Sequence, residues 1–139
     1  MDATRFLMAQ EGVFAQVKLE LQAGRKQTYW MWFVFPQLAR LGHSAMAQRF
    51  ALEDAEAARA YLRHPVLGFR LRTCTSLVAS QETRSAHDIF GFVDAMKFRS
   101  SMTLFDFIAA PRERCFGECL DRFFDGAGDP ATLDQLRAA

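Results

Sequence analysis

Apolar residues recur three or four positions apart through most of the chain, and no segment alternates apolar and polar residues as a half-buried strand does. Residues that begin or end helices separate these stretches, among them Gly24, Pro36, Ser44 and Gly91. Such a chain has no strands to pair, so it must bury its apolar faces helix against helix. The pattern predicts an all-α fold of six to eight short helices, with residues 1–139 as a single domain.

The most apolar segment, from Thr28 to Phe35, reads TYWMWFVF and has no periodicity that assigns it. It could form a buried strand or a helix buried on all sides, and Pro36 stops either one. Because no partner strand is found elsewhere, we expect a helix. Trp30 and Trp32 stand two positions apart and cannot share a helix face. We therefore expect one indole inside and the other along a groove.

Several helix boundaries follow from capping residues. A first helix of about five turns should run from Thr4 to a C-terminal cap at Gly24. N-terminal caps are expected at Ser44, at Ser85 with Asp88 as a capping box, at Asp94 for a helix that runs to Pro111, and at Asp129 before Pro130.

The charge balance disfavours some classes of partner. Lys and Arg number 17 against 16 Asp and Glu, so the formal net charge is only +1, and no basic excess indicates a nucleic-acid partner. The longest apolar run falls far short of the roughly 20 residues of a membrane span. The first residues lack the pattern of a secretory signal. We expect a cytoplasmic protein that is not associated with a membrane.

Cysteines and catalytic motifs point to no metal or cofactor. Cys115 and Cys119 stand one helical turn apart, but no nearby His or Cys completes a metal site, so the three cysteines are expected as reduced thiols in the core. No nucleophile elbow, phosphate loop or dinucleotide fingerprint is present. Conventional hydrolases, kinases and dehydrogenases are therefore disfavoured, and whether the protein is an enzyme stays open.

The first candidate site is the segment from Lys26 to Gln37. An exposed indole beside a lysine can stack a flat base, and the amide of Gln37 can recognise polar edges. The alternative is a central helix packed on all sides, because aromatic runs are usually core.

The second candidate site lies between Asp94 and Phe105. On a helix Asp94 and Lys97 are neighbours, with Ser101 a turn further along the same side. This carboxylate, ammonium and hydroxyl could bind phosphate or a ribose diol, or transfer a proton. Three hydroxyls, of Ser100, Ser101 and Thr103, interrupt an apolar stretch and need partners. The alternative is a capped helix with one surface ion pair.

Four sequence blocks carry a resemblance to a known family. They are G-x-K-x-S/T-H-W-M-W-F-x-F-P-Q from Gly24 to Gln37, L-G-x-S from Leu41 to Ser44, Y-L-x-H-P-V-L-G-x-R-L from Tyr61 to Leu71, and I-F-G-x-x-D-x-x-K-x-x-S-S-M-T-L-F from Ile89 to Phe105. In these blocks the chain resembles domain-of-unknown-function family 1810, an uncharacterised bacterial family, and the resemblance implies an all-helical fold. Tyr29 stands where the family usually has His. A phenol has a pKa of about 10 against about 6.5 for imidazole, so Tyr29 would be a poor substitute for a proton carrier.

Members of that family are sometimes labelled "calpastatin", but such inhibitors are disordered and this chain is 50% hydrophobic. The chain is also loosely similar to the NADAR group, which is linked to NAD and ADP-ribose and includes N-glycosidases. That similarity implies a pocket for a ribose- or nucleotide-like ligand. An indole would stack on the ligand, Lys26 and Lys97 would meet negative charge, and Asp94 would stabilise an oxocarbenium ion.

The predicted site therefore has two parts. The expected catalytic residues are Asp94 and Lys97, and the expected ligand-binding residues are Lys26, Tyr29, Trp30, Trp32, Gln37, Ser100, Ser101 and Thr103. The alternative function is a non-enzymatic protein-interaction or binding module, in which the same segments form the core and a groove that faces a partner.

Overall fold

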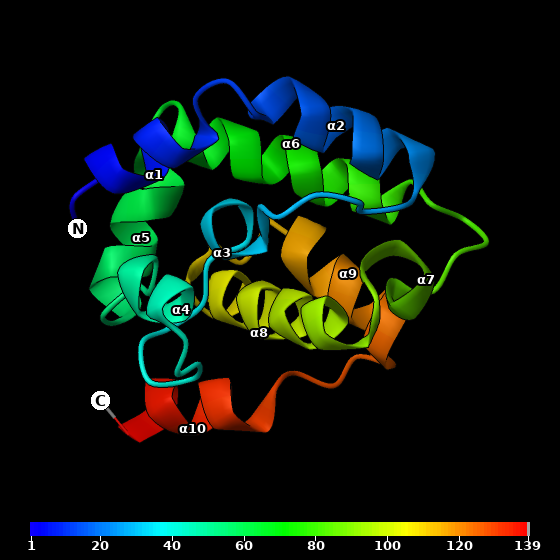
Figure 1. Cartoon of the computed structure of the whole chain (residues 1–139). Helices are drawn as coiled ribbons and strands as arrows, with labels where there is room; N and C mark the ends of the chain where they lie inside the picture. The colour runs from blue at the N-terminus through cyan, green and yellow to red at the C-terminus, as the bar shows by residue number, and fades with distance from the viewer. Residues whose placement is uncertain (139) are drawn as a thin grey trace.

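The computed structural model describes residues 1–138 of the chain (Figure 1). These residues contain ten helices and one isolated β-bridge. The helices are α1 (Thr4–Gln10), α2 (Phe14–Ala23), α3 (Met31–Val34), α4 (Ala45–Arg49), α5 (Ala55–Arg63), α6 (Leu67–Ala79), α7 (Ala86–Phe90), α8 (Phe92–Ile108), α9 (Cys115–Phe124) and α10 (Pro130–Ala138). Seven of these have seven residues or more. The predicted all-α fold is confirmed.

Helix α3 lies between the two main groups of helices. Helices α2 and α6 run side by side along one edge of the molecule, and α8 packs against α5, α7, α9 and α10 (Figure 1). The short α3 contacts both α6 and α8. The most apolar segment of the chain therefore occupies the middle of the fold, as its composition requires.

Phenylalanines fill the core around α8. The Phe98 ring lies 5.0 Å from that of Phe35 and 4.7 Å from that of Phe90, measured between centroids, and Phe35 and Phe98 are fully buried. The rings of Phe123 and Phe124 on α9 each lie 6.3 Å from the Phe98 ring, again between centroids. Phe98 thus joins α7, α8, α9 and the residue that directly follows α3 through ring contacts, which explains the phenylalanine-rich composition.

Three boundary predictions need correction. The first helix is split into α1 and α2 because Gly12 adopts a φ of 78°, which no helix tolerates. Its predicted cap at Gly24 is confirmed, with a φ of 74°. Helix α8 begins at Phe92 with Gly91 at its N-cap, so Asp94 lies in the first turn and is not the cap. Of the TYWMWFVF segment, only Met31–Val34 is helical.

The other predicted caps are present. Ser44 accepts a hydrogen bond from the Ala47 backbone N–H, and Ser85 and Asp88 form the capping box. Asp129 accepts from the Thr132 backbone N–H at the start of α10. Local capping chemistry therefore decided these boundaries.

The core also holds two of the three cysteines. Cys74 and Cys119 are buried, and burial raises the pKa of each thiol to about 12. Both pack in the main hydrophobic cluster, as predicted, whereas Cys115, which was expected there too, is only partly buried against it. Within residues 1–138, the helices are too short or too polar to cross a membrane.

Replacing Phe98 with Ala should lower the free energy of unfolding by about 3–5 kcal/mol, because it leaves a cavity among four other rings. Urea unfolding followed by circular dichroism measures this change. The matched control is Phe69→Ala, whose ring is 67% exposed and whose removal should cost no more than about 0.5 kcal/mol. Equal losses for the two variants would contradict the described core.

Candidate functional site

Two lysines share one carboxylate at the start of α8. Lys26 Nζ lies 3.0 Å from Asp94 Oδ2, and Lys97 Nζ lies 3.0 Å from Asp94 Oδ1. The three side chains are 9%, 22% and 20% exposed for Lys26, Lys97 and Asp94. We call these three residues the lysine–aspartate cluster. Its net charge is one positive unit.

The chain path explains why Lys26 reaches Asp94. Lys26 follows α2, and its backbone N–H donates to the carbonyl oxygen of Ile89 at 2.7 Å. This bond joins the connection after α2 to the end of α7, a few residues before Asp94. Lys26 Nζ also donates to the Thr28 carbonyl oxygen at 2.6 Å. Two segments more than sixty positions apart thus meet at the cluster.

Glu20 holds this connection in place. Its side chain is buried and accepts hydrogen bonds from the backbone N–H groups of Gln27 and Thr28, the Thr28 hydroxyl, the Trp30 indole and the Gln16 amide. Burial alone would raise the pKa of Glu20, but the bonds from Thr28, Gln27 and Trp30 outweigh it and lower the pKa from 4.5 to about 2.

Sequence reasoning missed Glu20, although a signal was present. Glu20 stands three residues after Val17 and just before Leu21, both fully buried, so it falls on the apolar face of α2. A carboxylate on an apolar face needs buried hydrogen-bond donors. The polar residues between Gly24 and Trp30 supply them.

The two tryptophans take different places, as expected from their spacing. Trp30 is 1% exposed and donates its indole N–H to Glu20 at 3.0 Å, so it belongs to the core. Trp32 is partly buried, and Lys97 Nζ lies 4.6 Å from the centroid of its ring. Of the two, Trp32 is the one that a ligand can reach. Tyr29 is 85% exposed beside the cluster.

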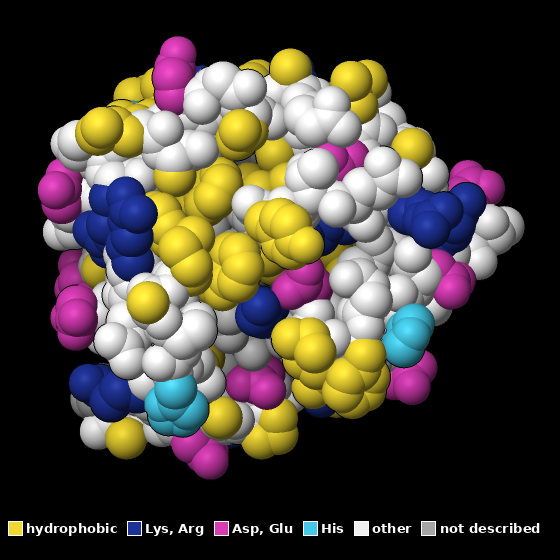
Figure 2. Space-filling view, in the orientation of Figure 1, with side chains coloured by type: hydrophobic (Ala, Val, Ile, Leu, Met, Phe, Trp, Pro, Cys, Tyr) yellow, Lys and Arg dark blue, Asp and Glu magenta, His cyan; other side chains and the backbone are white. Residues whose placement is uncertain are grey.

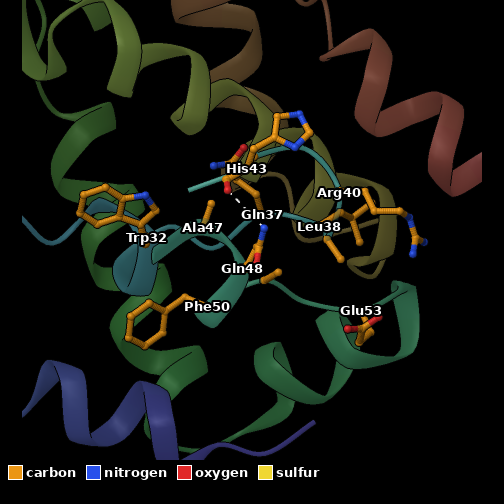
Figure 3. A pocket seen from close by; sticks show the side chains of 12 residues that line it. Trp32, Gln37, Leu38, Arg40, His43, Ala47, Gln48, Phe50 and Glu53 are labelled. Carbon is orange, nitrogen blue, oxygen red and sulfur yellow. Dashed lines mark hydrogen bonds between the residues drawn. The ribbon is translucent and has the colours of Figure 1, made fainter. Parts of the chain in front are cut away.

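A pocket of about 350 Å³ opens next to Trp32. Trp32 and Phe50 lie at one end of it and Arg40 and Glu53 at the other, with the Gln37 side chain between them (Figure 3). His43 and Gln48 also line it. The pocket thus combines aromatic walls with amide and charged groups, the mixture found in small-molecule sites.

The pocket wall is tied at its base. The Ala39 N–H donates to the Leu52 carbonyl oxygen at 2.8 Å, and the Leu52 N–H donates to the Gln37 carbonyl oxygen at 2.9 Å. Residues 40–51 therefore form an excursion that these two hydrogen bonds close at its base. Helix α4 lies within it, and Phe50 near its end packs back into the core. The Gln135 side chain on α10 adds a hydrogen bond to the Ala39 carbonyl oxygen at 2.9 Å.

The hydroxyls of α8 are not part of this arrangement. Ser100 Oγ donates to the Met96 carbonyl oxygen, and Thr103 Oγ1 donates to the Arg99 carbonyl oxygen. Thr103 Oγ1 also accepts from the Asp129 N–H, and Ser101 is fully buried. None of the three lines the pocket beside Trp32. The Ser100 and Thr103 hydroxyls find partners within α8 and at the start of α10, whereas the buried Ser101 Oγ has no hydrogen-bond partner within the described residues.

The structure thus brings together five of the ten predicted site residues in two adjoining places. Lys26, Asp94 and Lys97 form the cluster, and Trp32 and Gln37 line the pocket. Trp32 joins the two, because its ring contacts Lys97 and also forms a pocket wall. No group of three or more His, Cys, Asp or Glu side chains in residues 1–138 is placed to hold a metal ion.

Replacing Glu20 with Gln should lower the free energy of unfolding at neutral pH by about 2 kcal/mol, because charge-assisted hydrogen bonds are lost in a buried place. The pKa of Glu20 is lowered on folding, so its stabilisation is present above pH 4.5 and declines as the pH falls from there toward about 2. The difference in the free energy of unfolding between the wild type and Glu20→Gln should therefore become smaller as the pH falls over that range.

Urea unfolding at a series of pH values measures this difference, with the exposed Glu11→Gln as the matched control. A difference that stays constant between neutral pH and pH 3 would contradict the ionised, hydrogen-bonded state of Glu20.

Comparison with known proteins agrees with the sequence blocks. A family model described as "Protein of unknown function (DUF1810)" matches residues 1–136. The fold is similar to the crystal structure of the conserved hypothetical protein Rv1873 from Mycobacterium tuberculosis, with a TM-score of 0.96, 43% sequence identity, and coverage of 99% of this chain and 98% of that chain. Among curated proteins none matches. The chain therefore belongs to the DUF1810 family of proteins of unknown function.

Proposed function

We propose that this protein binds a ribose- or nucleotide-like small molecule in the pocket beside Trp32. The observation that carries the proposal is the Trp32 ring, which forms one wall of the pocket while Lys97 packs against it. A partly buried indole held in this way is a stacking surface for a flat ring. The volume of about 350 Å³ lies at the small end of ligand pockets, which span roughly 300–1,000 Å³.

The polar groups of the pocket suit the other parts of such a ligand. Within the described residues, the side chains of Gln37, Arg40 and Glu53 make no hydrogen bond or ion pair with protein atoms. The Gln37 amide can donate to and accept from the edge of a base. At the opposite end from Trp32, Glu53 can accept from ribose hydroxyls and Arg40 can pair with a phosphate (Figure 3).

Asp94 acts in this proposal as a positioning residue. Both of its carboxylate oxygens lie within 3.0 Å of a lysine ammonium, so its negative charge is already compensated. A compensated carboxylate is a weak stabiliser of an oxocarbenium ion. Its effect is to fix Lys97 against the Trp32 ring. We therefore propose binding without cleavage of an N-glycosidic bond.

Thermal unfolding in the presence of NAD, ADP-ribose, nucleosides, nucleotides and ribose phosphates tests the proposal. A ligand at 100 times its dissociation constant adds about 2.7 kcal/mol, which raises the Tm of a domain of this size by roughly 3–6 °C. At least one member of the panel should produce this rise in the wild type. Trp32→Ala and Gln37→Leu should abolish it, since they remove the stacking wall and the edge contact.

The matched controls are Phe69→Ala and Gln22→Leu, which change exposed residues outside the pocket and should keep the response. A panel without any Tm rise, or a rise that persists in folded Trp32→Ala, would contradict binding at this pocket. Release of a free base by the wild type, lost in Asp94→Asn, would show that Asp94 is catalytic and contradict its positioning role.

A further inference from the structure

Four large apolar side chains stand exposed around the lysine–aspartate cluster. Tyr29 is 85% exposed, Phe92 69%, Val93 64% and Met96 41%. We call these four residues the apolar collar. Single exposed apolar residues are ordinary, but several together on one face mark an interaction surface.

The collar surrounds the cluster on two sides. Tyr29 lies on the side of Lys26, whose Nζ is 5.9 Å from the centroid of the phenol ring. Phe92, Val93 and Met96 occupy the first turns of α8, interleaved with Asp94 and Lys97. In Figure 2, hydrophobic side chains lie on either side of adjoining basic and acidic side chains near the centre of the face.

The centre of the collar is positively charged. Two ammonium groups face a single carboxylate, which leaves one positive unit uncompensated. The collar also lies at the N-terminal, positive end of the 17-residue helix α8, where Gly91 provides no side-chain cap. Lys97 donates one hydrogen bond, to Asp94, and is 22% exposed, so its ammonium has N–H groups left for a further acceptor.

The cluster is fixed before any partner arrives. Lys26 is held by Asp94 and by the Thr28 carbonyl oxygen, and Lys97 by Asp94 and the Trp32 ring. A surface whose charged groups are already ordered loses little side-chain entropy on binding. Aromatic and methionine side chains around a fixed charge are the composition of interface hot spots.

We propose that the apolar collar and the lysine–aspartate cluster form a docking site for a protein segment that carries an Asp or Glu carboxylate between apolar side chains. The carboxylate meets Lys97, and the flanking apolar side chains cover Phe92, Val93 and Tyr29. A second copy of this chain is a poor occupant, because a symmetric contact would place one positive centre on another. The proposal does not depend on ligand binding in the pocket.

A displayed library of random heptapeptides, selected on the immobilised wild-type protein, is the probe. Enriched peptides should contain Asp or Glu flanked by apolar residues. A synthetic copy of the most enriched peptide should bind at least about tenfold more tightly than its Asn or Gln analogue, as expected for a charge-assisted hydrogen bond at a partly buried site. Isothermal titration calorimetry measures both affinities.

Two variants locate the binding surface. Phe92→Ser combined with Val93→Ser should weaken the same peptide by tenfold or more, while Phe69→Ser, which changes an equally exposed ring on α6, should leave its affinity unchanged. Circular dichroism of both variants checks that they are folded before their affinities are compared.

Four outcomes would overturn the proposal. They are no enrichment, enrichment of peptides without an acidic residue, equal affinity for the collar variant, and self-association in sedimentation that the collar variant abolishes. The last outcome would assign the surface to a second copy of the chain.

Discussion

The buried carboxylate of Glu20 is the interaction on which the rest of the site depends. A connection that leaves α2 and crosses to the centre of the fold carries polar backbone groups into the protein, and these groups need partners. Glu20 accepts from two of its N–H groups, from the Thr28 hydroxyl and from the Trp30 indole. One side chain thus fixes the path of this connection. That path brings Lys26 to Asp94 and places the aromatic segment between the two main groups of helices.

The different positions of the two tryptophans follow from the hydrogen bonds of Glu20. Once its indole N–H is bound to Glu20, Trp30 can lie in the core without an unsatisfied donor. Trp32, two positions on, is then turned toward the excursion of residues 40–51 and forms a pocket wall. Lys97 covers part of its ring, and Asp94 fixes Lys97. The contacts that hold the core around Trp30 therefore also position the Trp32 ring of the proposed binding surface.

The sequence predicted what local chemistry decides. The all-α class and the caps at Gly24, Ser44, Ser85 and Asp129 depend on a few neighbouring residues, so they could be inferred. The break at Gly12 could not, because a glycine within a helical pattern is often tolerated. The pocket residues Arg40, His43 and Glu53 were missed as well, because the Leu38–Leu52 bridge that gathers them is a tertiary contact.

The most direct test of this account follows the two indole N–H signals in a ¹H–¹⁵N spectrum while a nucleotide is added. The Trp30 N–H should exchange slowly with solvent, because it is buried on Glu20, and its chemical shift should not change during the titration. The Trp32 signal should exchange fast and shift as the ligand stacks. A fast-exchanging Trp30 signal, or a Trp32 signal that no member of the nucleotide series moves, would contradict it.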